Sequence, residues 1–403
     1  MKKSLPVLLA LVLCMTACTP AASTTPESDT PPVNEETAET ATAEESVAFP
    51  VGHLRRIQQY ESTADAVYST VNFWTDEGEP QFQLLKVDLA DAQRVSLYMG
   101  DSPDLYGVQV LSWQGQICLF GWDTLYKVPE EGGTAQQFPL GKELNPEFVD
   151  EYAVYEFEYR MDRGSNSGKR IDLETGQITN LELPGQIEWI NQTGTSRFIM
   201  TRAITQTPLP SYKEWEVYDA LLQSGEREFD WYDPATGAME KVMAEPYYGE
   251  EQPDGKRRRH DFLGMAGDRL YFSWYNEDGS ANGVESCALD GSDWQQMPGR
   301  LERERPDWIF SQNGTLRWMM KGEPGNLWIY DLSAGQMYEL PHITVANGWP
   351  EALVGQNQVL VSRGRDPDIV DGFALISLED YLAGSTDWTP ITDAPDGGTT
   401  IVF

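Results

Sequence analysis

Short runs of alternating apolar and polar residues recur along the chain from residue 49 to residue 403. Most of these runs come in pairs separated by Asp, Gly or both, residues that tolerate the positive φ of a tight turn. The pattern predicts β-hairpins, and seven copies are recognisable: 84–98, 125–140, 169–184, 229–243, 285–298, 327–341 and 374–391. We therefore expect an all-β fold.

The seven hairpins repeat at a nearly regular distance. Taken at residues 88, 128, 172, 233, 289, 331 and 377, their turns lie 40 to 46 residues apart at four of the six intervals. A second hairpin-like stretch precedes each turn, as in 110–121 and 310–320. Units of this length with four strands are typical of β-propeller blades. The repeat predicts seven four-stranded blades, with six or eight also compatible; a β-sandwich would not account for the sevenfold repeat.

The two longer intervals, 61 and 56 residues, predict insertions in the fourth and fifth units. In the first insertion, Ser211 and Glu214 have the spacing of a capping box, and Gly225 follows as a stop signal. The apolar residues between these signals fall on one helical face: Trp215, Tyr218, Leu221 and Leu222. We expect a short helix over 211–224, laid against a blade edge.

The second insertion, 244–262, is rich in proline and contains the only dense basic cluster of the sequence, residues 256–259. A loop of this length is typical of a functional or mobile segment.

One stretch of the chain resembles a known family. Residues 305–320 read RPDWIFSQNGTLRWMM, in which a proline-flanked Trp308 precedes the turn 311–314, SQNG. This stretch is similar to the TolB-type (WD40-like) propeller repeat, whose turn reads Ser-Pro-Asp-Gly; here Gln and Asn replace Pro and Asp. The other units match more loosely. The resemblance implies a propeller of the cell envelope, serving as a non-enzymatic scaffold or as an accessory domain of a peptidase.

The first residues have the composition of an export signal. Lys2 and Lys3 precede an apolar run over residues 5–13, and small residues lead into Cys18. Residues 15–18, MTAC, resemble the bacterial lipobox, whose cysteine is acylated and becomes the new N-terminus. We expect residues 1–17 to be removed and Cys18 to anchor the protein by lipid to the extracytoplasmic face of the cell membrane. An ordinary signal peptide that happens to contain cysteine is the alternative.

The segment after the signal has a different composition from the rest of the chain. Residues 18–48 are rich in Thr, Pro and Glu and contain no Lys or Arg, which predicts a disordered tether before a folded domain over 49–403. The formal net charge of the whole chain is −35. Such a charge argues against binding nucleic acid, or anionic lipid through the domain surface. We expect membrane contact through the lipid anchor alone and a monomeric domain.

Catalytic motifs do not occur in the sequence. The three histidines, His53, His260 and His342, lack the spacing of a metalloprotease, and no nucleophile elbow, phosphate loop or CxxC pair is found. Cys118 and Cys287 fall within apolar strand-like runs of non-adjacent units, so we interpret them as buried free thiols, although an exported protein can form disulfides. The many Trp and Tyr residues are interpreted mainly as core.

One acidic pattern is sharper than the rest. An acidic residue stands just before the first strand of six successive units: Asp104, Glu147, Glu188, Asp261, Asp307 and Glu351. The first strand of a blade is the innermost one, so we expect these carboxylates around one mouth of the central channel. Crowded carboxylates require a compensating cation, which Arg55 and Arg56 of the first unit or a bound Ca²⁺ could supply. The alternative is that each acid caps its own loop in solvent; no other cofactor is expected.

Two classes of function remain. A rigid propeller without catalytic motifs favours a non-catalytic binding or protein-interaction module outside the cytoplasm, with a protein or a glycan as its ligand. The alternative is a hydrolase or lyase that acts on envelope or environmental glycans through acids at the channel mouth.

Overall fold

The computed structural model describes residues 49–394 except 76, 102–107, 122, 142–143, 160, 162–165, 324–325, 345–346 and 364–371. The chain forms two units, Met1–Ser46 and Val47–Phe403, and all described residues belong to the second. The predictions for residues 1–48, Cys18 among them, therefore lie outside the described residues, as does the prediction for Asp104.

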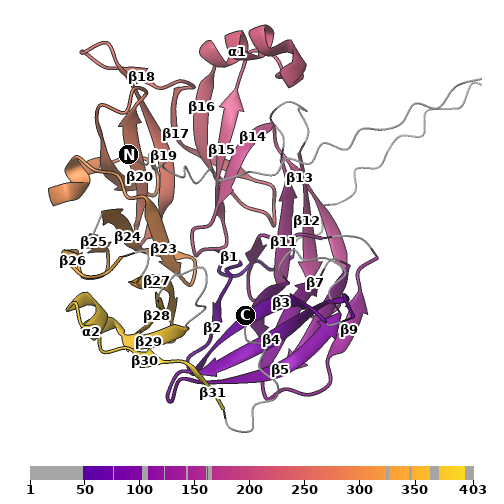
Figure 1. Cartoon of the computed structure of the whole chain (residues 1–403). Coiled ribbons are helices and arrows are strands. Elements are labelled where there is room, and N and C mark those ends of the chain that lie inside the picture. Colours follow the sequence, from indigo (N-terminus) through magenta and orange to yellow (C-terminus); the bar gives the residue numbers. More distant parts are fainter. Residues whose placement is uncertain are drawn as a thin grey trace, which may run out of the picture. The chain divides into compact units, whose positions relative to one another are not determined.

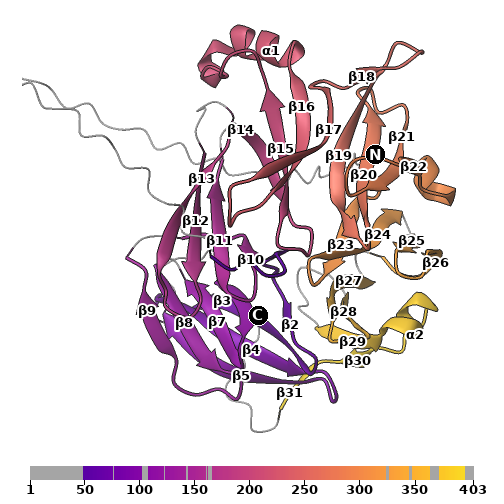
Figure 2. The same ribbon diagram turned by 180° about the vertical axis from the view of Figure 1, so that it is seen from behind.

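Within the described residues, seven small sheets follow one another around a ring in the order of the chain (Figures 1 and 2). We number them blades 1 to 7. The strands of the first four blades are, in order: β2 (Glu61–Ser62), β3 (Ala66–Trp74), β4 (Pro80–Asp88) and β5 (Gln93–Asp101); β6 (Gln109–Trp113), β7 (Gln116–Gly121), β8 (Thr124–Pro129) and β9 (Gln136–Pro139); β10 (Phe148–Val149), β11 (Ala153–Glu158), β12 (Asn166–Asp172) and β13 (Ile178–Leu183); β14 (Gln186–Asn191), β15 (Phe198–Ile204), β16 (Glu226–Tyr232) and β17 (Met239–Pro246).

The last three blades continue the same order. Their strands are β18 (Glu250–Glu251), β19 (Arg257–Ala266), β20 (Arg269–Asn276), β21 (Asn282–Ala288) and β22 (Gln295–Gln296); β23 (Trp308–Gln312), β24 (Thr315–Glu323), β25 (Asn326–Asp331) and β26 (Gln336–Leu340); β27 (Asn347–Val354), β28 (Gln358–Arg363), β29 (Phe373–Ser377) and β30 (Thr389–Pro390). Neighbouring strands within these blades run antiparallel. The chain folds as a seven-bladed β-propeller, so the predicted fold class is confirmed.

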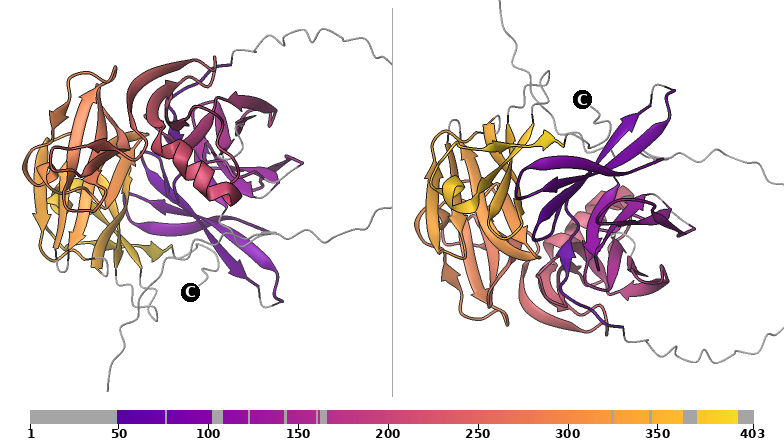
Figure 3. Two further views of the ribbon diagram at one scale, coloured as in Figure 1. Left: turned by 90° about the horizontal axis from the view of Figure 1, so that it is seen from above. Right: turned by 90° about the horizontal axis from the view of Figure 1, so that it is seen from below.

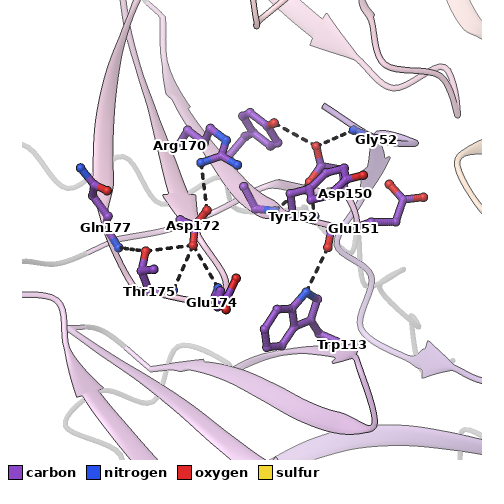
Figure 4. Close-up of polar contacts among 12 residues, drawn as sticks. Gly52, Trp113, Asp150, Glu151, Tyr152, Arg170, Asp172, Glu174, Thr175 and Gln177 are labelled. Carbon is purple, nitrogen blue, oxygen red and sulfur yellow. Dashed lines mark hydrogen bonds and ion pairs between the residues drawn. The ribbon is translucent and has the colours of Figure 1, made fainter. Parts of the chain in front are cut away.

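Six of the seven predicted hairpins join the third and fourth strands of their blades, and the hairpin of blade 5 joins its fourth and fifth strands, β21 and β22. In four blades an Asp ends the third strand and its side chain accepts a hydrogen bond from the backbone N–H two residues later: Asp88, Asp172, Asp233 and Asp331. A glycine follows four residues after Asp172, with φ 72°, a conformation that costs glycine little. Figure 4 shows this turn, where Asp172 also accepts from Thr175. The recurring Asp and Gly are therefore turn-forming residues.

The core consists of seven apolar clusters, each shared by two neighbouring blades of the described chain. One cluster closes the ring, because Leu360 of blade 7 packs with Val67 of blade 1. Large aromatic residues fill these layers, and Trp318 and Trp328 are fully buried. Cys118 and Cys287 are buried as free thiols, as predicted, and burial raises the pKa of Cys118 to about 12.

Both ends of the described chain fasten the ring. Near the C-terminus, β31 (Thr392–Asp393) adds a parallel strand beside β5 of blade 1, and Arg94 pairs with Asp393 at 2.8 Å. Near the N-terminus, β1 (Arg55–Arg56) pairs with β10 and becomes the first strand of the blade 3 sheet. Blade 1 is formed by residues 61–101, from the N-terminal part of the described chain. Blade 7 is formed by residues 347–390, from its C-terminal part.

The N-terminal segment, residues 49–60, connects blades that are far apart in the sequence. The Gly52 N–H donates to Asp150 at 3.0 Å in blade 3 (Figure 4), and the Leu54 N–H donates to the Thr195 carbonyl in blade 4. The Gln58 side chain reaches the Ser311 carbonyl in blade 6. This segment therefore joins three blades on the face where the first and second strands turn.

The helix predicted over 211–224 is present. A 3₁₀ turn, η2 (Tyr212–Glu214), leads into α1 (Trp215–Gln223), and the Ser211 side chain accepts a hydrogen bond from the Lys213 N–H. The helix lies beyond the ends of β15 and β16, outside the sheets (Figures 1 and 3). Two further short helices are η3 (Gly299–Glu302) and α2 (Leu378–Leu382).

Trp215, which was expected on the buried face of this helix, is exposed. Tyr218 and Leu222 are buried, but Trp215 is 56% exposed. The helix packs on the blade through Tyr218 and Leu222, with Leu221 partly buried beside them, so the prediction that Trp215 shares the buried face is wrong.

Candidate functional site

The described acids of the predicted ring lie in or next to the first strand of a blade or, in blade 5, in β19, which follows the two-residue strand β18. Glu147 and Asp307 directly precede β10 and β23, whereas Glu188, Asp261 and Glu351 lie within β14, β19 and β27. The first strands of neighbouring blades lie side by side, as β23 and β27 do. Their local environments nevertheless differ.

Glu188 of blade 4 and Asp261 of blade 5 are joined by one arginine. Arg227, at the start of β16 and 6% exposed, contacts Glu188 at 2.7 Å and Asp261 at 3.1 Å. Burial alone would lower the pKa of Arg227, but the two carboxylates outweigh burial and raise it. Two of the predicted acids are therefore brought together with a buried cation between them.

The two insertions meet at the same place. In the second insertion, the Tyr247 hydroxyl donates to Glu188 at 3.2 Å and Arg259 pairs with the same carboxylate at 3.2 Å. The next residue, Tyr248, donates to Asp219 of α1 at 2.7 Å. Tyr247 also packs in an apolar cluster with residues of the helix and β15. The second insertion thus covers Glu188, and the helix of the first insertion packs against the second.

A third acid lies one blade further along the ring. Glu147 pairs with Arg56 at 3.0 Å, as the predicted compensation requires, whereas Arg55 pairs with Glu61. Burial raises the pKa of Glu147 despite the opposing effect of Arg56. The Arg56 guanidinium also lies 5.5 Å from the centre of the Trp189 ring. Trp189 follows Glu188 in the sequence and is 46% exposed.

We call this group the rim cluster: Arg56, Glu147, Glu188, Trp189, Arg227, Tyr247, Arg259 and Asp261. It combines an accessible indole with charged groups held in place by several partners. Such a surface can stack against a sugar ring, an aromatic group or a cationic side chain while the charges supply directed hydrogen bonds.

The other two described acids are outside the rim cluster. Asp307 is exposed, and within the described part of the chain its carboxylate contacts no cation. Trp308, next to it, packs edge-on against Trp349 at 4.8 Å. Glu351 lies half-buried on β27. In the described residues, no group of three or more His, Cys, Asp and Glu side chains is arranged to hold a metal ion.

The predicted basic loop is a strand whose charges are mostly paired. Residues 257–266 form β19, and the Arg258 guanidinium lies 4.1 Å from the centre of the Trp274 ring. The Nδ1–H of His260 donates a hydrogen bond to the Glu245 carboxylate at 2.8 Å, and the ring lies 3.7 Å from Glu285. Burial would lower the pKa of His260, but its hydrogen bonds to these carboxylates raise it to about 9.

Sequence reasoning missed Arg227, Arg259 and Tyr247 as members of the site. Arg227 stands in an ordinary strand and carries no motif. The insertion length and the basic cluster were the available signals for Arg259 and Tyr247, because they marked the segment that departs from the repeat.

Two cavities lie next to turns between strands of the described chain, near residues 266–267 and 312–315 and near residues 195–197. One, of about 360 Å³ between blades 5 and 6, is lined by Tyr271, Gln312 and Arg317 among others. The other, of about 300 Å³ between blades 4 and 5, is lined by Arg197 and Trp231 among others. Neither contains a residue of the rim cluster.

No protein-family model matches the sequence, and no curated protein matches it. Solved structures do match. The β-propeller domain of the Trilobed protease from Pyrococcus furiosus, which has an open velcro topology, superposes with a TM-score of 0.50 and 10% identity, over 86% of this chain and all of that chain. At this identity the likeness shows the propeller fold alone.

Two other matched structures superpose less closely. TolB from Acinetobacter baumannii has a TM-score of 0.32 and 10% identity, over 77% of each chain. An oligogalacturonate lyase from Vibrio parahaemolyticus has a TM-score of 0.37 and 11% identity, over 83% of this chain and 89% of that chain. Among the described residues, no helix is long and apolar enough to span a bilayer.

Proposed function

We propose that this protein is a lipid-anchored, extracytoplasmic binding module with a TolB-type propeller. In this proposal residues 1–17 are removed, Cys18 is acylated, and residues 18–48 tether a monomeric propeller to the cell membrane. A Cys18→Ser variant should appear in the soluble fraction or remain as an unprocessed precursor. Unchanged membrane retention and processing would rule out the anchor.

The rim cluster is the proposed ligand site. The observation that carries this proposal is the position of Trp189: its accessible ring lies 5.5 Å from the Arg56 guanidinium, which pairs with Glu147, and Trp189 directly follows Glu188 in β14. The second insertion contributes Tyr247 and Arg259 to the same group, and the helix of the first insertion packs against Tyr247. The ligand is an extracytoplasmic protein segment or a glycan, since both can offer a flat apolar face with polar edges.

The test compares Trp189→Ala with Trp308→Ala on a panel of neutral and acidic glycans. Both tryptophans follow an acid at the start of a first strand, and their exposures are similar, 46% and 42%. We expect Trp189→Ala to weaken glycan binding by about tenfold, the usual effect of losing one stacking anchor, and Trp308→Ala to leave it unchanged. Equal effects of the two variants would place the site elsewhere.

The second candidate is an enzyme that acts on glycans. One observation favours it: burial raises the pKa of Glu147, which is the property of a general acid. Product analysis of the bound glycans separates the two candidates, because a binding module returns them intact. Turnover that is lost in Glu147→Gln would establish the enzyme.

Calcium remains a proposed ligand of the acidic positions. Ca²⁺ bound only by the native state must raise the melting temperature. A Ca²⁺ titration of the wild type beside Asp307→Asn/Glu188→Gln therefore decides the matter, and a flat response in both would exclude calcium.

A further inference from the structure

Helix α1 has an exposed aromatic face that the propeller does not use. Tyr218 and Leu222 fasten the helix to blade 4, whereas Tyr212, Trp215 and Val217 are each more than half exposed. Large apolar side chains gathered on one exposed element are typical of an interaction surface. Tyr212 and Trp215 both pack on the buried Tyr218, and we call these two residues the α1 face.

The aromatic residues of the α1 face are held in fixed positions. The Trp215 ring stacks on the buried Tyr218 ring, with 5.8 Å between centroids and 19° between planes. The Tyr212 ring packs on the same tyrosine at 4.5 Å. Because Tyr218 is 1% exposed, it forms a rigid base under both rings. A preorganised face loses little conformational entropy when a partner binds.

The charges around the face are predominantly acidic. Glu214 and Glu216 flank Trp215, and both are exposed, against the single cation Lys213. The whole chain carries a formal net charge of −35, which attracts cationic partners and repels anionic ones. Aromatic rings beside carboxylates bind guanidinium and ammonium groups by cation–π contact and ion pairing.

The molecule already contains this arrangement internally. The Arg258 guanidinium lies 4.1 Å from the centre of the Trp274 ring and 3.9 Å from a carboxylate oxygen of Glu285. The α1 face offers the same pair of groups, an indole and a carboxylate, toward solvent.

We propose that the α1 face docks a basic segment of a partner protein. An Arg or Lys side chain of the partner stacks on Trp215 or Tyr212, and Glu214 and Glu216 pair with its charges. This surface does not require the rim cluster to be a binding site, although Tyr248 connects the two through Asp219.

The test measures binding of a short Arg-rich peptide to the full chain, with a Glu-substituted peptide of the same length beside it. Trp215→Ala should weaken binding of the Arg-rich peptide by about tenfold or more. Glu214→Gln/Glu216→Gln should weaken binding and reduce its dependence on salt. The control is Trp74→Ala, which removes an equally exposed indole, also 56% accessible, from β3 of blade 1.

Several results would overturn the proposal. Binding that is equal in the wild type and Trp215→Ala would show attraction to the net charge alone. An equal loss in Trp74→Ala would show non-specific contact with any exposed indole. Vesicles of phosphatidylcholine and phosphatidylglycerol that bind through Trp215, while the peptide does not, would make the α1 face a lipid-contact surface. Trp189→Ala should leave peptide binding intact, so failure here is distinguishable from failure at the rim cluster.

Discussion

Glu188–Trp189 in blade 4 and Asp307–Trp308 in blade 6 are the same motif at the same place in the blade, yet their surroundings differ. Glu188 accepts contacts from Arg227, Arg259 and Tyr247. Asp307 faces solvent, and its tryptophan packs against Trp349. The repeat therefore determines where an acid stands, whereas its partners come from the blade strand that carries Arg227 and from the second insertion, which carries Tyr247 and Arg259.

The largest expected effect on stability comes from removing Arg227, the cation that joins Glu188 of blade 4 to Asp261 of blade 5. Arg227→Ala leaves Glu188 and Asp261 without their shared partner, which should lower the free energy of unfolding by about 3–5 kcal/mol. Chemical denaturation measures this difference. The control is Arg197→Ala, since Arg197 pairs with the 64% exposed Glu240 and should cost about 1 kcal/mol or less. If Arg227→Ala and Arg197→Ala lowered the free energy of unfolding by similar amounts, the buried pairs of Arg227 would be no more stabilising than the exposed pair of Arg197.

The protonation of His260 should make the stability of the blade 4–5 region depend on pH. Its pKa of about 9 in the folded protein exceeds the ordinary value of 6.5. The stabilisation is therefore complete below about pH 6.5 and is lost as the pH rises through about 9, with a total of ~3 kcal/mol. Denaturation at a series of pH values should show this loss in the wild type. His260→Gln and Glu245→Gln should both flatten the profile over that window; an unchanged slope would contradict the assignment.

A smaller effect is expected at Glu188 itself. Glu188→Gln retains the shape of the side chain but removes the charge that three donors share, so the free energy of unfolding should fall by about 1–3 kcal/mol. Thermal unfolding beside the wild type checks this value. A loss in Arg227→Ala without any loss in Glu188→Gln would mean that Asp261 alone holds the arginine.

The smallest effect is expected at the matching acid of blade 6. Asp307→Asn changes a solvated carboxylate, so the free energy of unfolding should change by no more than about 0.5 kcal/mol. The same unfolding measurement applies. A loss as large as that of Glu188→Gln would show that both motifs are embedded in comparable networks.

The sequence was sufficient for the fold because the decisive signals are local. Asp172, Asp233 and their equivalents hydrogen-bond to backbone groups two residues away, so each hairpin can be recognised from its own residues. The same holds for the helix after Ser211. The exposure of Trp215 could not be predicted in the same way. It depends on how far the helix extends beyond the blade, and the spacing of apolar residues within the helix carries no information on that.

The candidate site was only partly accessible from the sequence for the opposite reason. Arg227 and Glu188 are 39 residues apart, and Tyr247 and Glu188 are 59 apart. Such contacts depend on how strands of one blade lie across the sheet and on how the second insertion folds over it. The acids could be found because they recur at the same position in each repeat. Their partners, Arg227 and Tyr247, do not recur from one repeat to the next, so no pattern marks them.

The way in which both chain ends fasten the ring has a consequence for biogenesis. The N-terminal segment is synthesised before the residues that it binds. The hydrogen-bond partner of Gly52, Asp150, comes 98 positions later, and that of Gln58, Ser311, comes 253 positions later. Arg94 pairs with Asp393 across 299 positions. Such distant pairing slows folding. The outer edge of blade 1 therefore stays unpaired until residues 392–393 have been synthesised, and in that interval the nascent chain is most exposed to aggregation and proteolysis.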